Sequence, residues 1–148
     1  MRFRAALLLA CLAELAVWPT PGGAHSVPTP AQISRAVQVW KRYAECERSQ
    51  RFEPCFVLLS TNVRRAWTDT GRATADAYAF VRGGEEIAFD ELRLLRVRKS
   101  PGRVVLVVRA RGRGTAGAFE QLWEYALLLE GGEWRIDGKR EGLHETLP

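Results

Sequence analysis

The chain has 148 residues, of which 47% are hydrophobic and 26% are charged, and its formal net charge is +5. This length is that of one domain. The excess of basic residues, most of them arginine, is compatible with an anionic partner. The sequence contains no recognisable set of catalytic residues, so composition and motifs do not by themselves identify a reaction.

The N-terminal segment 1–24 has the three-part layout of a secretory signal peptide. Met1–Arg4 carries positive charge, and Ala5–Val17 is an apolar run. Prolines, glycines and a final Ala24 follow the run, so we expect cleavage before His25. The mature protein is therefore expected to be exported, to the periplasm or to the medium, and export argues against a nucleic-acid partner.

A membrane anchor and a lipoprotein signal are weaker interpretations of this segment. A retained membrane anchor would need about 20 apolar residues, but the run is shorter and Glu14 interrupts it. A lipoprotein signal would use Leu8–Cys11, but the apolar run continues beyond that cysteine. Nothing later in the sequence is long and apolar enough to cross a bilayer, so no stable membrane span is expected after cleavage.

Two cysteines, Cys46 and Cys55, remain after cleavage. The eight residues between them exclude the CxxC spacing of a redox site. An oxidising compartment favours a disulfide between them, and two free buried thiols are the alternative. A metal site would need further ligands, but His25 and His144 are the chain's two histidines and lie at its ends. We therefore expect neither a metal nor a cofactor.

The spacing of apolar residues predicts three helices, over residues 30–49, 54–67 and 73–82. Thr29 and Gln32 form a capping-box pattern around Pro30 at the start of the first helix. Pro54 is expected to open the second helix. Two glycines end the third helix.

The period of apolar residues then changes from 3.6 to 2, which predicts four strands. They cover residues 92–97, 104–113 and the two arms of a hairpin at 122–138. In the second strand, Arg109, Arg111 and Arg113 share one face. Three helices followed by an antiparallel meander form an α+β layout, in which a curved sheet would bury the apolar face of the first helix.

The register of the hairpin follows if Gly131 and Gly132 form a tight turn. Tyr125 then opposes Gly138, and one hairpin face is apolar except for a phenol. That face holds Trp123, Tyr125, Leu127, Leu129, Trp134 and Ile136. Asp137 falls on the other face, so it is not expected to meet Tyr125.

The long first helix with the aromatic pair Trp40 and Tyr43, the segment Leu58–Trp67 and the hairpin closing on Gly132–Asp137 resemble the nuclear transport factor 2-like (cystatin-like α+β) superfamily, in its secreted bacterial form. The resemblance implies a cone, with three N-terminal helices packed against a curved antiparallel four-stranded sheet and a pocket at the open end. Members include isomerases, dehydratases, small-ligand binders and dimerisation modules, so fold is implied far more than function. The expected boundaries are an extended lead at 25–30, the domain at 31–140 and a polar tail at 141–148.

An enzyme of the ketosteroid-isomerase type would pair a carboxylate base with a tyrosine or a protonated acid that stabilises an oxyanion. The candidate groups are Tyr43, Asp69, Asp76, Tyr78, Asp90, Tyr125 and Asp137. Asp69 and Asp76 have the positions of turn and helix caps, and the domain has no histidine for dehydratase chemistry. No catalytic residue is assigned, and a small-molecule isomerase or lyase is the alternative function.

We expect instead a non-catalytic binding or assembly module of the bacterial envelope. Six aromatic residues are candidates to line a pocket for a small apolar ligand: Trp40, Tyr43, Trp67, Trp123, Tyr125 and Trp134. The simpler interpretation is that they fill the core. Arg109, Arg111 and Arg113 form a candidate basic surface, or else a solvated sheet face. A homodimer through the sheet is a further candidate assembly.

Overall fold

The structure is a computed structural model that describes residues 26–66 and 75–141. The helical elements are α1 (Pro30–Ser49), the 3-10 helix η1 (Glu53–Leu58), α2 (Thr61–Ala66) and α3 (Ala75–Gly83). The strands are β1 (Ala88–Ser100), β2 (Arg103–Gly114), β3 (Gly117–Glu130) and β4 (Glu133–Glu141). Helices followed by strands confirm the predicted α+β order. The predicted signal peptide, Trp67, Asp69 and the tail beyond residue 141 lie outside the described residues.

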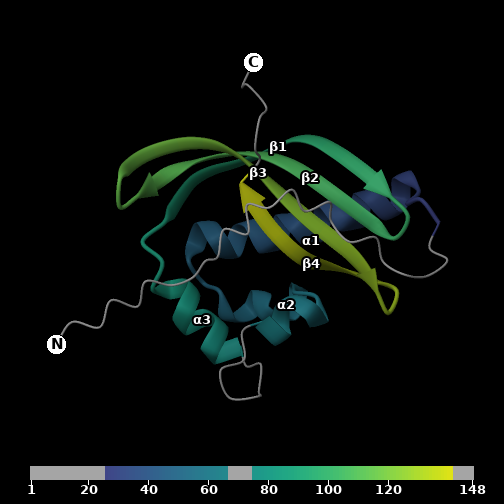
Figure 1. Cartoon of the computed structure of the whole chain (residues 1–148), viewed down its shortest axis with the longest axis horizontal. Helices are drawn as coiled ribbons and strands as arrows, with labels where there is room; N and C mark the ends of the chain where they lie inside the picture. The colour runs from purple at the N-terminus through teal and green to yellow at the C-terminus, as the bar shows by residue number, and fades with distance from the viewer. Residues whose placement is uncertain (1–25, 67–74, 142–148) are drawn as a thin grey trace.

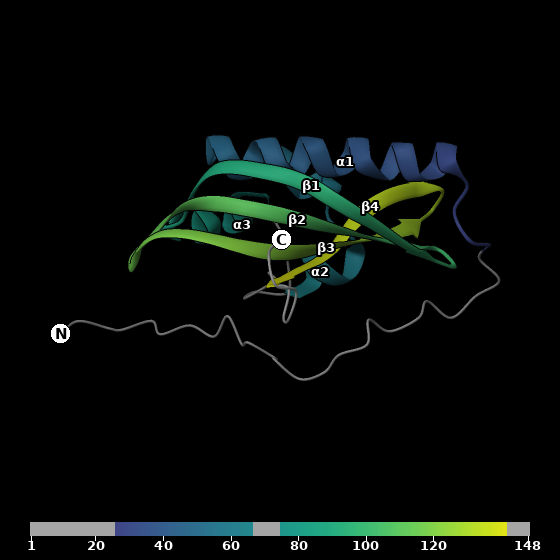
Figure 2. The same ribbon diagram turned by 90° about the horizontal axis from the view of Figure 1, so that it is seen from above.

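The four strands form one antiparallel sheet in the order β1-β2-β3-β4. The sheet arches over α1, with α2 and α3 below the helix in this view (Figure 1). Seen from above, α1 runs lengthwise along the sheet (Figure 2). Because α1 contacts both β1 and β4, the two edge strands, it closes the open side of the curved sheet.

Local hydrogen bonds and backbone conformation determine where helix α1 begins and ends. The Thr29 hydroxyl accepts a hydrogen bond from the Gln32 N–H and the Gln32 side chain accepts one from the Thr29 N–H, which confirms the predicted capping box. At the other end, Gln50 has a left-handed backbone with φ of 57°. The buried residues of α1 are Ala36, Trp40, Tyr43, Ala44, Cys46 and Glu47. Its face toward the sheet therefore carries a carboxylate.

The predicted second helix is wrong as a single element. Leu59 and Ser60 interrupt it, because their backbone attaches to the sheet instead. Leu59 forms an isolated parallel bridge with Ile136, and the Ser60 N–H donates to the Ile136 carbonyl over 2.8 Å. The segment is thus divided into η1 and α2, and it is fixed to β4.

No helix among the described residues is long and apolar enough to cross a membrane.

A disulfide between Cys46 and Cys55 joins the last turn of α1 to η1. The two Cα atoms are 6.3 Å apart, within the usual range for a disulfide. The bond fixes the corner between the two helices, one residue away from the buried Glu47.

The turn at Gly131–Gly132 and the pairing of Leu127 with Ile136 are as predicted. The predicted pairing of Tyr125 with Gly138 is wrong, because a β-bulge lies between these points. Ala126 pairs with Gly138, and Tyr125 pairs with Lys139. A bulge places one extra residue on one strand and shifts the alternation of all residues beyond it. Lys139 therefore shares the inner face with Tyr125.

The core lies between α1, the short helices and the inner face of the sheet. From β2 it takes Val104, Leu106 and Val108, which are 0% exposed. Strand β1 begins at Ala88, four residues earlier than predicted, and its register shifts at two places. These shifts and the bulge in β4 accompany the curvature that lets the sheet enclose the helix.

Candidate functional site

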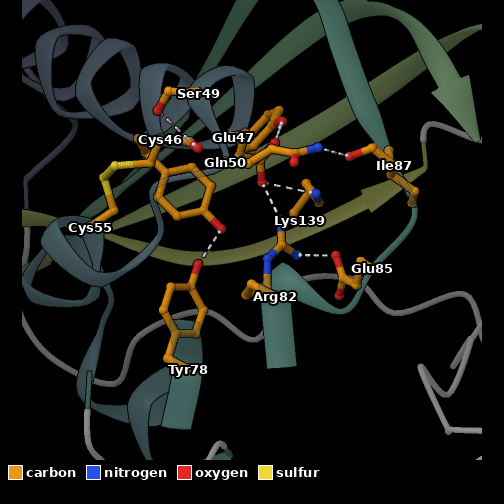
Figure 3. Close-up of polar contacts among 12 residues, drawn as sticks. Cys46, Glu47, Ser49, Gln50, Cys55, Tyr78, Arg82, Glu85, Ile87 and Lys139 are labelled. Atoms are coloured by element: carbon orange, nitrogen blue, oxygen red, sulfur yellow. Dashed lines mark hydrogen bonds and ion pairs between the residues drawn. A yellow bond between two sulfur atoms is a disulfide. The ribbon is translucent and has the colours of Figure 1, made fainter. Parts of the chain in front are cut away.

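A buried carboxylate, Glu47, lies at the centre of the domain with a side chain that is 0% exposed. Its Oε1 atom accepts from Arg82 Nη2 over 3.0 Å and from Lys139 Nζ over 2.9 Å. Its Oε2 atom accepts from the Tyr125 hydroxyl over 2.8 Å. Figure 3 shows Arg82 and Lys139 converging on this carboxylate. Both oxygens are therefore hydrogen-bonded.

Two further tyrosines complete what we call the buried polar cluster. The hydroxyls of Tyr43 and Tyr78 are 3.0 Å apart and hydrogen-bonded to each other. The cluster consists of Tyr43, Glu47, Tyr78, Arg82, Tyr125 and Lys139. It contains all three tyrosines of the chain.

Helical spacing brings the members from α1 and α3 together. Tyr43 and Glu47 are four residues apart on α1, and Tyr78 and Arg82 are four apart on α3, so each pair shares a helix face. Arg82 also forms an ion pair with Glu85, and its guanidinium lies 4.9 Å from the centre of the Phe52 ring. The cation thus has two carboxylates and an aromatic face around it.

Lys139 reaches the cluster from β4 because of the bulge. Its ammonium lies 4.7 Å from the centre of the Trp123 ring and 5.3 Å from that of Phe89, so aromatic faces stabilise the charge. Burial lowers the pKa of Lys139, and the Glu47 charge opposes that shift. The amine side chain is 16% exposed.

Burial alone would raise the pKa of the Glu47 carboxyl. The charges of Lys139 and Arg82, with hydrogen bonds from Lys139 and Tyr125, outweigh burial and bring the pKa below its ordinary value. A general base works best when its pKa lies near the operating pH. Glu47 is therefore a stable carboxylate and a weak base.

The phenols of the cluster stay neutral. Burial, followed by the nearby Glu47 charge, raises the pKa of Tyr43 and of Tyr125 well above the ordinary value. Burial also raises the pKa of Tyr78. All three hydroxyls can therefore donate hydrogen bonds but do not supply a phenolate at neutral pH.

A separate pocket opens at the surface between α1 and the β3–β4 hairpin, and we call it the helix–hairpin pocket. Its volume is about 460 Å³. Its apolar lining is Val39, Leu58, Leu129 and Trp134, and its basic lining is Arg35, Arg42 and Arg135. A second hollow, of about 580 Å³, lies at the far end of the sheet beside Gly112 and Phe119. Neither hollow is lined by a member of the buried polar cluster.

Solved structures of other proteins superpose on the chain at TM-scores of 0.50 and above. A nuclear transport factor 2-like protein from Anabaena variabilis has a TM-score of 0.52 at 12% identity, over 82% of this chain and 97% of that one. This chain has the nuclear transport factor 2-like fold. A SEC-C motif-containing protein from Rhodopseudomonas palustris has a TM-score of 0.50 at 16% identity, over 72% of this chain and 88% of that one. No protein-family model and no curated protein matches the sequence significantly.

The aromatic residues selected from the sequence separate into three groups within the nuclear transport factor 2-like fold. Trp40 and Tyr43 make edge-on ring contacts with Tyr125 in the core, with centroids 6.1 and 6.2 Å apart. Trp123 is half-buried and lies against Lys139. Trp134 is buried but borders the helix–hairpin pocket.

The basic surface is partly neutralised. Arg109, Arg111 and Arg113 share the outer sheet face, as their alternation predicts. Arg111 forms ion pairs with Glu91 and Glu120, and Arg109 forms one with Glu120. Within the described part of the chain, Arg113 has no ion pair.

Asp137 does not join the buried polar cluster. It accepts a hydrogen bond from the Ser60 hydroxyl over 2.7 Å and forms an ion pair with Arg103 over 3.2 Å. Its predicted separation from Tyr125 is thus correct. Across residues 26–66 and 75–141, no three His, Cys, Asp or Glu side chains gather to form a metal site.

Sequence reasoning missed the charged members of the cluster. Glu47 could have been found, because it lies seven residues after Trp40 on the apolar stripe of the first helix. Arg82 follows Tyr78 at helical spacing, which is a weaker signal. Lys139 had no signal, since simple alternation in the hairpin places it on the outer face.

Proposed function

We propose that this protein is an exported, non-catalytic binding module of the bacterial envelope. The observation that supports the proposal best is the state of Glu47. On the concave side of the sheet, where this fold suggests a pocket, a carboxylate is held by Arg82, Lys139 and Tyr125. To act as a base it would have to give up these contacts.

The chemistry of the cluster favours a structural role. The low pKa of Glu47 makes it a poor proton acceptor, and the high pKa of Tyr125 keeps that phenol neutral. The carboxylate instead connects α1 with α3, β3 and β4. A ligand is then expected to bind at the protein surface and not at the buried polar cluster.

Export is supported by the layout of segment 1–24 and by the disulfide, since disulfides persist in oxidising compartments. The test is to express the full chain in a Gram-negative host and to analyse periplasm and medium by intact mass. We expect a mature N-terminus at His25 and one disulfide. A chain that retains Met1 and stays in the cytoplasm would contradict the proposal.

An isomerase is the second candidate, because Tyr125 and Glu47 form a phenol–carboxylate contact of 2.8 Å. The assay follows conversion of a β,γ-unsaturated ketone to the conjugated enone by ultraviolet absorbance. We expect no rate above that of buffer. Turnover by the wild type that is lost in the Glu47→Gln variant would contradict the binding-module proposal and support an isomerase.

Assembly through the outer face of the sheet is the weaker form of the proposal. Leu122 is 7% exposed and Ala126 is 0% exposed in the single chain, so little of their apolar surface is left for a partner. Sedimentation equilibrium is expected to give a monomer. A stable dimer would instead support a function as an assembly module.

A further inference from the structure

We propose that the helix–hairpin pocket binds an organic anion that has an apolar body, specifically an aliphatic carboxylate. This inference rests on the binding function proposed above and names its ligand class. It depends on three features of the pocket: its size, its apolar floor, and two arginines on one side of its rim.

The size and floor suit a small molecule. About 460 Å³ falls within the range of ligand sites, roughly 300–1,000 Å³. The floor draws on three elements: Val39 from α1, Leu58 from η1, and Leu129 and Trp134 from the hairpin. Val39 and Leu129 are half-buried and supply the apolar surface that a ligand can reach, while Leu58 and Trp134 are 4% and 5% exposed and continue the floor into the core. An apolar ligand body placed here would be removed from water.

The rim has an excess of positive charge. Arg35 and Arg42 flank Val39 on α1, four residues before it and three after it, so all three lie on one helix face. Both arginines are exposed, and neither guanidinium has an ion pair or hydrogen bond within the described part of the chain. They are therefore available to a ligand.

The opposite wall already has its charges matched. Arg135 donates to the Val57 carbonyl and forms an ion pair with Glu133. The single carboxylate of the lining is thus engaged, and the α1 side of the rim has no counterion. A guanidinium binds a carboxylate through paired hydrogen bonds. An anionic head at Arg35 and Arg42 with an apolar body over Trp134 satisfies both parts of the pocket.

The experiment uses the mature full chain, isothermal titration calorimetry and a matched set of probes. Octanoate carries both features, acetate carries the charge alone, and octyltrimethylammonium carries the chain with the opposite charge. We expect saturable binding of octanoate, and no saturation with the other two. Heteronuclear NMR is expected to show octanoate shifting the Trp134 indole signal.

The variant arm uses Arg35→Ala with Arg42→Ala. The double variant is expected to weaken octanoate binding at least about tenfold, because a hydrogen bond to a charged group contributes roughly 1.5–3 kcal/mol. Arg93→Ala is the matched control, since Arg93 is exposed on β1 and has no ion pair among the described residues. Unfolding curves establish that all variants are folded.

The possible contrary results would overturn different parts of the two proposals. Equal binding of octanoate and octyltrimethylammonium, or unchanged octanoate binding in the double variant, would overturn the proposed role of the arginines. Absence of octanoate binding would overturn the ligand class, whereas export without enone formation would leave the proposed binding module standing, with a ligand of another class. Enone formation, or retention in the cytoplasm, would instead contradict the proposed function itself.

Discussion

The Tyr125 hydroxyl donates a 2.8 Å hydrogen bond to Glu47 Oε2, joining residues that are 78 positions apart in the chain. The other oxygen of the same carboxylate binds Arg82 and Lys139. Four elements thus meet at one buried charge. Removing one member of such a network is far more disruptive than replacing the whole network by apolar residues, because the remaining charges stay buried without a partner.

Glu47→Gln is therefore expected to lower the free energy of unfolding by about 3–5 kcal/mol, since Arg82 and Lys139 would lose their shared counterion. Urea denaturation of the mature protein measures the change. Glu45→Gln is the control, because Glu45 lies on the same helix with a side chain that is 68% exposed. Its effect is expected to stay within about 0.5 kcal/mol. Similar losses in both variants would contradict the structural role of Glu47.

The low pKa of Glu47 predicts acid sensitivity. The folded state binds this proton less readily than the unfolded chain does, so the contribution to stability is present above the ordinary carboxyl pKa of about 4.3. It is lost as the pH falls through the lower folded-state pKa. The difference in unfolding free energy between wild type and Glu47→Gln should therefore shrink at acid pH. A difference that is constant between neutral and acid pH would be the contrary result.

The three tyrosines predict an unusual alkaline titration. Tyr43, Tyr78 and Tyr125 all have a raised pKa, and they are the only tyrosines in the sequence. Because unfolded phenols ionise near pH 10 while these do not, stability is lost as the pH rises above about 10. Phenolate absorbance should appear in one step that coincides with loss of the circular dichroism signal. A phenol that titrates near pH 10 in the folded protein would contradict this.

The disulfide predicts a redox dependence of stability. Closing a loop of this size contributes roughly 2–3 kcal/mol, so Cys46→Ser with Cys55→Ser should lower the free energy of unfolding by that amount. Chemical denaturation of the double variant, with and without reductant, measures it. Reductant should destabilise the wild type and leave the variant unchanged. A wild type that does not respond to reductant would show that the cysteines are not paired.

Gly112 predicts a steric difference between two glycines of β2. A Cβ at Gly112 would overlap the Ala88 carbonyl oxygen and lie 2.9 Å from the Phe119 ring, whereas at Gly114 the nearest atom is 3.8 Å away. Gly112→Ala should therefore destabilise by roughly 1–3 kcal/mol. Gly114→Ala should cause a much smaller change in the same thermal unfolding experiment. Equal effects would mean that the close packing of β1 on β2 does not hold in solution.

Much of the fold could be predicted from sequence, because local signals decide it. The capping box around Pro30, the turn at Gly131–Gly132 and the alternation in β2 depend on neighbouring residues alone. The single second helix failed because a long-range contact determined the local structure. Leu59 and Ser60 pair with Ile136, and no pattern within their own segment indicates that partner.

The candidate site was predicted in part. The positions of Tyr43 and Tyr125 in the interior follow from helical and strand periodicity. Periodicity also places Glu47 on the apolar stripe of α1, but its cations could not be predicted in the same way, and a buried carboxylate is tolerated only when such cations reach it. One of those cations, Lys139, depends on a bulge that alternation cannot reveal. The helix–hairpin pocket joins α1 to the hairpin and is a property of tertiary packing.

The bulge in β4 also determines which residues of the hairpin face each other beyond Leu127. If strand pairing continued from the Gly131–Gly132 turn without the extra residue in β4, Tyr125 would face Gly138 and Lys139 would point to solvent. Glu47 would then keep Arg82 but lose its second cation. The shifted pairing that is observed instead delivers Lys139 to the carboxylate. The ion pair therefore acts as a check on strand alignment: a hairpin closed one residue out of step leaves a buried charge only half compensated.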